Sequence, residues 1–213
     1  MFVMGHLQLI QSGQSLRRRR SDIMLAMQGY GATFFETPIG LCGLAWSGRG
    51  VTLLQLPEQT PEATRARVRQ RAKSPRERAP PPAISDAVAC IRALLRGGMI
   101  DLTTIALDMD RIEEFERRVY EVSRFIPCGE TRTYGAIARA IGEPNAARSV
   151  GQALGRNPYA LIVPCHRVVA AGGKTGGFSG GGGVVTKLRI LDIERGAAMR
   201  ADAALDEPQL RLL

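Results

Sequence analysis

A cysteine and a histidine stand next to each other between two apolar segments, at Cys165 and His166. A cysteine side chain attacks as its thiolate, and a neighbouring base or positive charge is the usual means of lowering its pKa. His166 and Arg167 could both serve that purpose. The segment 161–163 is rich in β-branched residues and predicts a buried strand, which Pro164 would end. We interpret Cys165 as a candidate nucleophile at a strand end; the alternative is a buried structural cysteine beside a chance His-Arg pair.

The composition narrows the class of protein. The 213 residues carry a formal net charge of +9, which favours a polyanionic partner such as nucleic acid, although basic tails could be its source. The cysteines lie far apart and only two histidines are present, so we expect neither a disulfide framework nor a metal site. No apolar segment approaches the roughly 20 residues that cross a bilayer. We therefore expect a protein of the reducing cytoplasm that does not contact a membrane.

The pattern along the chain predicts four parts and an α/β (α+β) fold. Residues 1–27 contain four consecutive arginines and predict a disordered basic arm, unless translation starts at a later methionine. Residues 28–109 predict a small N-terminal α/β domain built on an antiparallel sheet. Residues 110–198 predict a mainly helical C-terminal domain, and residues 199–213 a tail.

The N-terminal domain alternates short β-rich segments with turn residues, followed by helix-permissive segments. We expect strands at 32–35, 41–46, 51–56 and 100–107, a basic helix at 62–72, and a second helix that Ser85 caps. The arginines of the basic helix are interpreted as a solvated face, with contact to phosphates as the alternative. This half of the chain contains no group of residues that points to chemistry.

Two short helices of the C-terminal domain meet at a tight turn. Thr133 predicts the cap of a helix at 134–141, and Asn145 the cap of a second helix that ends near Gly155. The second helix carries one long basic side chain, Arg148, among four small residues: Ala146, Ala147, Ser149 and Gly151. Small residues let a helix backbone lie close to another surface, so we predict a DNA-binding helix-turn-helix. The alternative is a plain helical hairpin.

The last helix offers a partner for the imidazole. Leu188, Leu191 and Glu194 recur at steps of three, which places Glu194 near the buried face, where a carboxylate needs a partner. His166 is the obvious candidate, in a relay where Glu194 orients the imidazole and the imidazole assists Cys165. Contact between adjacent residues of an extended chain needs a bend or a bridging water. The alternative is an exposed glutamate at a helix end.

A glycine-rich segment, 172–183, follows the candidate nucleophile. It is either a linker or a wall that approaches a flat ligand closely, with Phe178 and Ser179 as ligand contacts. Its spacing is not that of a phosphate-binding loop, so we expect no nucleotide there.

Three motifs occur in order in the C-terminal domain: GETRTYG at 129–135, AARSVGQA at 146–153 and PCHRV at 164–168. Together they resemble the O6-alkylguanine-DNA alkyltransferases, also called methylated-DNA–protein-cysteine S-methyltransferases. The resemblance covers roughly residues 110–196, whereas the N-terminal half is similar only in the order of its strands and helices. Two departures, four consecutive glycines at 180–183 and Arg195 in place of a common glycine, bear on loop rigidity and on the range of alkyl groups.

The resemblance implies a DNA-repair protein that reverses damage directly. The Cys165 thiolate would take the alkyl group from O6-methylguanine, or from O4-methylthymine, in one irreversible step that needs no cofactor. His166 and Glu194 match the pair that activates the cysteine, and Asn157 matches the asparagine that lines the site. Tyr134 matches the tyrosine that rotates the phosphate and offers its hydroxyl to guanine N3.

The resemblance also implies how DNA is bound. A monomer would insert its helix-turn-helix into the minor groove of double-stranded DNA, with Arg148 filling the gap left by the flipped base. Ala146, Ala147 and Gly151 would face the DNA, while the base would meet three residues: Val168, Phe178 and Ser179. Two other functions compete with this interpretation. One is a lesion-binding relative without enzymatic activity, and the other is a cysteine hydrolase that releases its product.

Overall fold

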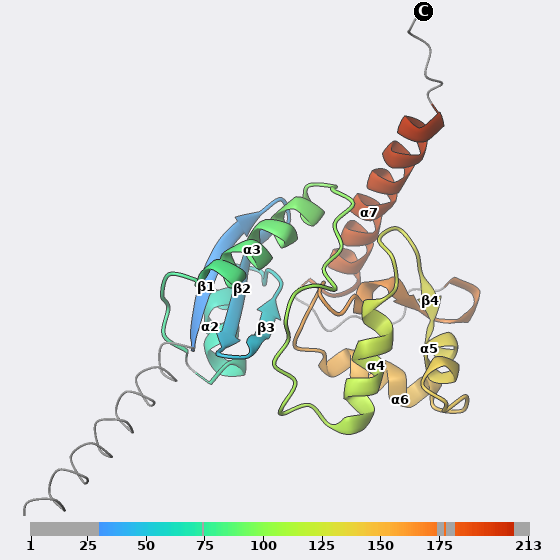
Figure 1. Ribbon diagram of the computed structural model, residues 1–213, viewed down its shortest axis with the longest axis horizontal. Helices are drawn as coiled ribbons and strands as arrows, with labels where there is room; N and C mark the ends of the chain where they lie inside the picture. The colour runs from blue at the N-terminus through green and yellow to red at the C-terminus, as the bar shows by residue number, and fades with distance from the viewer. Residues whose placement is uncertain (1–29, 74, 174–176, 178–181, 207–213) are drawn as a thin grey trace, which may run out of the picture.

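The computed structural model describes residues 30–73, 75–173, 177 and 182–206, and it has the expected α+β architecture. An antiparallel sheet with two helices forms one side of the molecule, and helices dominate the other side (Figure 1). The predicted arm at 1–27 lies outside the described residues. None of the helices in the described ranges is long and apolar enough to cross a membrane.

The first three predicted strands are confirmed. β1 (Gly31–Thr37), β2 (Gly40–Ser47) and β3 (Gly50–Gln55) form an antiparallel sheet in this order. Thr37 pairs with Gly40 and Ser47 pairs with Gly50, so two residues form each turn. Turn residues at 37–40 and 47–50 therefore do mark the ends of the strands, as the sequence indicates.

Two helices cover opposite faces of this sheet. α2 (Pro61–Arg71) places Val68 against Ala45 and Leu53, whereas the neighbouring Leu44 packs in the main core with α3 (Pro82–Leu95). Successive side chains of a strand point to opposite faces, so a one-residue step in the sequence changes the helix that a side chain meets.

The start of α3 differs from the prediction. Ser85 is inside the helix and does not cap it, because Pro81 holds the cap position and Pro82 begins the first turn. A proline fits the first helical turn well, since the N–H that it lacks would have no partner within the helix.

The predicted strand at 100–107 is wrong. This segment is an irregular connection that meets the sheet only at its end, where Val51 N donates to Ala106 O and Asp108 N donates to Val51 O, both at 2.9 Å. At its start, the carboxylate of Asp101 accepts hydrogen bonds from Thr103 at 2.8 Å. Such local side-chain bonds favour a turn over a strand.

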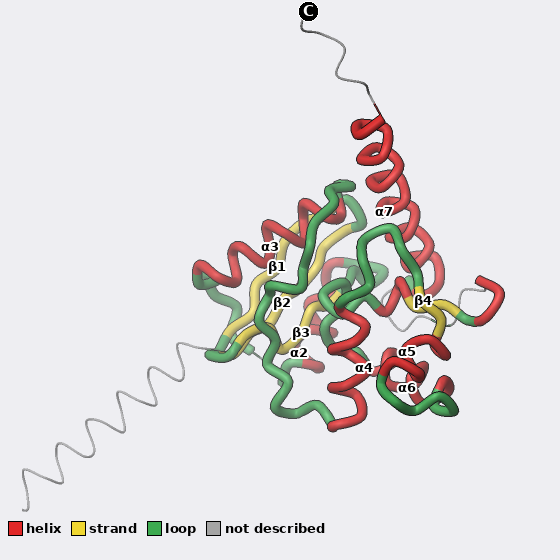
Figure 2. Tube along the Cα trace, turned by 45° about the vertical axis from the view of Figure 1, so that its right-hand side comes forward, coloured by secondary structure: helices red, strands yellow, loops and turns green. Residues whose placement is uncertain are grey.

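Helices α4 (Glu114–Arg124), α5 (Tyr134–Ala140) and α6 (Ala147–Arg156) pack together on the side away from the sheet (Figures 1 and 2). Thr133 caps α5 as predicted, since its Oγ1 accepts a hydrogen bond from Ala136 N at 3.1 Å. Asn145 does not cap α6. The turn between the two helices closes one residue later, with Ala146 at the cap position and no side-chain cap.

The segment 161–163 is buried as predicted, but it is not a strand. Leu161 has a φ of 67°, and Val163 N donates to Tyr159 O at 2.8 Å, so the chain turns here. A run of apolar residues indicates that a segment is buried but does not determine its backbone conformation. A buried turn can hydrogen-bond its backbone N–H and C=O groups as well as a strand can. A single 3-10 turn, Cys165–Arg167, follows Pro164 and leads into β5 (Val168–Val169).

The last helix connects the two halves of the molecule. α7 (Gly183–Asp206) contacts both α3 and the 3-10 turn Cys165–Arg167, and it extends from the body of the protein toward the C-terminus (Figure 2). Residues 199–206, which the sequence assigns to a tail, continue this helix. β5 also pairs in parallel with β4 (Arg132–Thr133), so the turn is held between a helix and a short sheet.

One continuous core crosses the predicted domain boundary near residue 110. It joins Leu44 and Leu54 of the sheet to Ile91, Tyr120 and Val163 in a single cluster of buried side chains. The two halves of the chain therefore stabilise each other by burying a shared apolar surface.

We predict that Gly50→Ala destabilises the junction between the sheet and the connection to α4. Gly50 has a φ of +143°, and a Cβ atom there would lie 2.5 Å from the carbonyl oxygen of Ala106. Strain of this kind costs on the order of 1–3 kcal/mol. Gly48→Ala, in the same turn and with open space around it, should change the free energy of unfolding by less than about 0.5 kcal/mol. Urea denaturation of both variants measures the difference, and equal losses would contradict the prediction.

Candidate active site

The candidate nucleophile lies at the start of the 3-10 turn. Pro164 stands at its cap position, and Cys165 N donates to Val163 O at 2.8 Å, which bends the chain out of the preceding turn. The bend separates the environments of neighbouring side chains: Cys165 remains partly accessible, whereas His166 and Arg167 are buried. The sequence left open whether a bend or a bridging water would connect Cys165 and His166; the chain does bend here, but Nδ1 of His166 has no hydrogen-bond partner among the described residues.

A buried carboxylate organises the two basic side chains. Glu194 of α7 is 1 % exposed, and its Oε1 lies 2.9 Å from Nε2 of His166. Arg167 donates to the same carboxylate from Nη2 at 2.8 Å and from Nε at 3.0 Å. The predicted position of Glu194 beside His166 is thus observed, and the exposed-glutamate alternative is wrong.

Arg167 is not the neighbour of the thiol that the sequence suggests. Its guanidinium points to Glu194, and its Nη1 donates to the carbonyl of Ile126, just after α4, at 2.6 Å. Arg167 therefore links three segments, while its charge is neutralised by the carboxylate. The sequence contains no signal for this direction, because the bend that turns Arg167 inward appears only in the structure.

The pKa values of the acid and the base respond to this arrangement. Burial would raise the pKa of Glu194, but hydrogen bonds and positive charge from His166 and Arg167 outweigh it and bring the pKa to about 2. Burial lowers the pKa of His166, against the opposing effect of Glu194. The site therefore favours an ionised Glu194 and a neutral imidazole at neutral pH.

The imidazole has a defined tautomer. Because Glu194 is ionised, Nε2 of His166 carries the proton and donates it to the carboxylate. The other ring nitrogen, Nδ1, is buried and has no hydrogen-bond partner among the residues that the structure describes. His166 thus presents a lone pair at Nδ1, which is the form that a general base needs.

Asn157, Lys187 and Tyr134 are among the side chains that act on the Cys165 thiol or respond to its charge. Burial raises the pKa of the thiol, and a hydrogen bond from Asn157 and the charge of Lys187 act in the opposite direction. Asn157 is held in place, since its Nδ2 donates to Val163 O at 2.9 Å and its Oδ1 accepts from Tyr159 N at 2.8 Å. Burial also raises the pKa of Tyr134, and the negative charge of a Cys165 thiolate would add to this effect.

Lys187 is a site residue that the sequence reading missed. Its side chain is fully buried, and Nζ donates to the carbonyl oxygen of Val168 at 2.7 Å. A signal was available: Lys187 precedes Glu194 by seven residues, so both lie on one face of α7 with Ile190. The predicted buried face of this helix was defined from Leu188, which is in fact exposed, and so it did not include Lys187.

The predicted DNA-binding residues lie on the outer face of α6 and at its start. Arg148 is exposed, and no carboxylate pairs with it in the described part of the chain. Ala146, Ala147 and Gly151 are partly exposed around it. Tyr134 contacts this helix, since a Cβ atom on Gly151 would lie 3.8 Å from the tyrosine ring. The small-residue surface and the surroundings of the sulfur are therefore adjacent, with Tyr134 between them.

Two predicted substrate contacts, Phe178 and Ser179, lie outside the described residues. Val168 is described, and its side chain is buried in the core with no exposed surface. Its carbonyl oxygen accepts the hydrogen bond from Lys187, and its role as a substrate contact stays a prediction.

Comparisons with known proteins point in one direction. The family model described as 6-O-methylguanine DNA methyltransferase, DNA binding domain, matches residues 114–196. A protein of Mycolicibacterium paratuberculosis named methylated-DNA–protein-cysteine methyltransferase is 42% identical over 161 residues, which are 75% of this chain and 89% of the relative. One of the same name from Methanothermobacter thermautotrophicus is 38% identical over 71% of this chain and 78% of its own length.

Solved structures agree with the sequence relatives. Mycobacterium tuberculosis OGT in complex with DNA matches with a TM-score of 0.62 and 38% identity, over 78% of this chain and 94% of that chain. The O6-methylguanine-DNA methyltransferase of Pyrococcus kodakaraensis matches with a TM-score of 0.62 and 28% identity, over 76% and 98% of the two chains. Both matches extend well beyond the C-terminal motifs and include the N-terminal half.

We predict that Glu194→Gln lowers the stability of the protein at pH 7, because Arg167 loses its buried partner charge. Breaking a buried ion pair costs on the order of 3 kcal/mol. The folded-state pKa of Glu194, about 2, lies below the ordinary value of 4.5. Its contribution is therefore present above about pH 4.5 and is lost as the pH falls toward 2. The gap between the wild type and the variant should narrow over this range in urea denaturation.

Glu130→Gln provides the matched control. Glu130 pairs with Arg132 at 2.9 Å on the surface, where an ion pair contributes less than about 1 kcal/mol. A loss of stability for Glu130→Gln as large as that for Glu194→Gln would contradict the role of the buried carboxylate.

Proposed function

The chain belongs to the methylated-DNA–protein-cysteine methyltransferase family, and from this premise we propose that it moves the alkyl group of O6-alkylguanine in DNA onto Cys165. It is a methyltransferase that repairs DNA by alkyl transfer. One observation supports the assignment of the acceptor: Cys165 is followed by a buried imidazole whose Nε2 lies 2.9 Å from an ionised carboxylate. The transfer is irreversible, so one molecule of protein repairs one lesion.

Cys165 attacks as a thiolate that forms when the substrate is in place. The thiol proton passes to Nδ1 of His166, through a bridging water where the two atoms do not touch, and Glu194 stabilises the imidazolium that results. The sulfur then bonds to the alkyl carbon as the bond from that carbon to O6 breaks, and the electron pair moves into the guanine ring. Asn157 and Lys187 favour the thiolate by hydrogen bonding and by charge.

Tyr134 assists the departure of guanine, the leaving group of the reaction. Its pKa is raised by burial, so its hydroxyl stays protonated and can donate a hydrogen bond to guanine N3. This hydrogen bond stabilises the negative charge that develops on guanine as O6 leaves the alkyl carbon. The imidazolium of His166 carries the proton that the thiol has lost, so charge is balanced over the whole step.

DNA reaches the site through the outer face of α6. The alkyl carbon is inaccessible while guanine is stacked, so the base must be extruded from the duplex. We assign Arg148 as the side chain that fills the vacated space, while Ala146, Ala147 and Gly151 let the helix approach the minor groove closely. O4-methylthymine would enter by the same route, with the pocket deciding how well it fits.

We further propose that the protein acts as a monomer in the reducing cytoplasm. The cysteines are all free thiols in the structure, at Cys42, Cys90, Cys128 and Cys165, which suits an environment that does not form disulfides. A free acceptor thiol is a requirement of the reaction itself.

We predict that incubation with DNA containing one O6-methylguanine adds one methyl mass to the protein, on Cys165, without a cofactor. Cys165→Ala should bind the lesion and accept no methyl group. Intact mass and peptide mapping measure both outcomes. A methyl group on Cys42, Cys90 or Cys128 would sink the assignment, an unchanged mass with tight binding would favour a lesion-binding protein, and repeated turnover would favour a hydrolase.

We predict that Arg148→Ala slows transfer from duplex DNA much more than transfer from the free base O6-benzylguanine, which needs no extrusion. Losing the side chain that stabilises the flipped state should reduce the duplex rate on the order of tenfold or more. Arg139→Ala removes an exposed arginine of α5 and serves as the control for charge. Single-turnover rates on both substrates decide the question, and equal losses on duplex and free base would refute the role of Arg148.

A further inference from the structure

A cavity of about 600 Å³ lies between the N-terminal sheet and the connections that lead into α4 and out of α6. Its walls come from β2 and β3, from the segment after α2, from the connection 108–112 and from Pro158 and Tyr159. Cys165, Tyr134 and Arg148 are not part of these walls. The cavity is therefore separate from the site of alkyl transfer.

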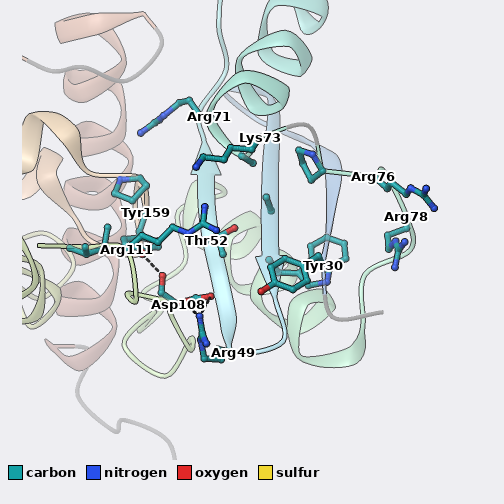
Figure 3. Close-up of a pocket in the computed structure, with 16 residues that line it drawn as sticks. Tyr30, Arg49, Thr52, Arg71, Lys73, Arg76, Arg78, Asp108, Arg111 and Tyr159 are labelled. Carbon is teal, nitrogen blue, oxygen red and sulfur yellow. Dashed lines mark hydrogen bonds and ion pairs between the residues drawn. The ribbon is translucent and has the colours of Figure 1, made fainter. Parts of the chain in front are cut away.

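Positive charge dominates the walls of this cavity. Six basic side chains line it: Arg49, Arg71, Lys73, Arg76, Arg78 and Arg111. Figure 3 shows Arg111 and Tyr159 on one side, Arg76 and Arg78 on the other, and Lys73 near Thr52 between them. Cations around one space repel one another, so the free energy of this arrangement falls when an anion enters.

The single carboxylate of the lining is already engaged. Asp108 accepts a hydrogen bond from Ser47 Oγ at 2.5 Å and pairs with Arg49 at 3.2 Å. Lys73, Arg76 and Arg111 are exposed to solvent, and none of them has a carboxylate partner within the described ranges. These three side chains are available for a ligand, and arginine donors match the geometry of phosphate oxygens.

The same cavity also has an aromatic and apolar part. Tyr30 is 54% exposed at its edge, and Trp46 lines it with only 2% of the residue exposed. The indole Nε1 of Trp46 is buried and has no hydrogen-bond partner in the part of the chain that the structure describes. A buried donor without a partner is costly.

We propose that this cavity binds a nucleoside phosphate. The phosphate would lie beside Lys73 and Arg111, with the base against Tyr30 and the edge of Trp46. Basic side chains beside aromatic rings are the usual setting for a phosphate with a flat base, and the volume falls within the range of small-molecule sites. An acidic peptide would use the cations but would leave the aromatic part without a role. The ligand is a free nucleotide or a nucleotide of an unpaired strand, since both present this chemistry.

The chain has one tryptophan, so the fluorescence of Trp46 reports on this cavity directly. Full-length protein is titrated at low salt with AMP, with inorganic phosphate and with a short unmethylated single-stranded oligonucleotide. We expect a saturable change with AMP or the oligonucleotide, and a much weaker effect of inorganic phosphate. The double variant Lys73→Glu/Arg111→Glu should bind on the order of tenfold more weakly or worse.

The double variant Arg69→Glu/Arg96→Glu is the matched control, because it changes the net charge equally at exposed positions that do not line the cavity. It should bind within about twofold of the wild type. Tighter binding of AMP identifies a small-molecule site, and tighter binding of the oligonucleotide identifies a strand; either supports the proposal. No saturable binding by fluorescence and calorimetry, equal loss in both double variants, or equal binding of inorganic phosphate or a glutamate-rich peptide would overturn it.

Discussion

The buried carboxylate of Glu194 is the interaction on which the site depends. A carboxylate that is 1% exposed is stable only with hydrogen bonds and opposite charge around it. His166 and Arg167 supply both, and Arg167 also donates to Ile126 O at the end of the α4 segment. One acidic side chain thus joins α7, the turn that carries Cys165 and the segment after α4. Packing alone would not specify the direction of each of these side chains.

This arrangement determines the resting state of the reactive pair. Arg167 neutralises much of the charge of Glu194, so the carboxylate orients His166 without making it a strong base. Burial lowers the pKa of His166 and raises that of Cys165, and both shifts favour a neutral thiol beside a neutral imidazole. A standing thiolate would be open to oxidation before any lesion is met. In the proposed reaction the proton moves only when the substrate arrives, which suits a protein that can react only once.

Local sequence patterns correctly predicted the elements whose ends are marked by turn or capping residues. The strands around Leu44 and Leu53 follow from short β-rich segments bounded by turn residues, and the helix after Thr133 follows from its capping residue. The segment 161–163 was predicted to be a strand because it is apolar, but apolar residues indicate burial and do not determine whether the backbone is extended or turned. Glu194 was found because a charge on a buried face demands a partner. Lys187 was missed although it shares a face of α7 with Glu194, whereas the inward direction of Arg167 depends on the turn after Pro164, which no local pattern contains.

The N-terminal half reaches the site through its backbone and through one arginine. Leu54 N of β3 donates to Pro158 O at 2.8 Å, and Arg71 of α2 bonds both Gln55 at 3.0 Å and the carbonyl of Asn157 at 3.3 Å. Asn157 in turn acts on the Cys165 thiol, whose pKa it lowers. A sheet without reactive groups of its own therefore holds one wall of the reactive site, because the core that it shares with the helices leaves residues 157–159 little freedom to move. The basic cavity lies against this same segment, since Pro158 and Tyr159 line it.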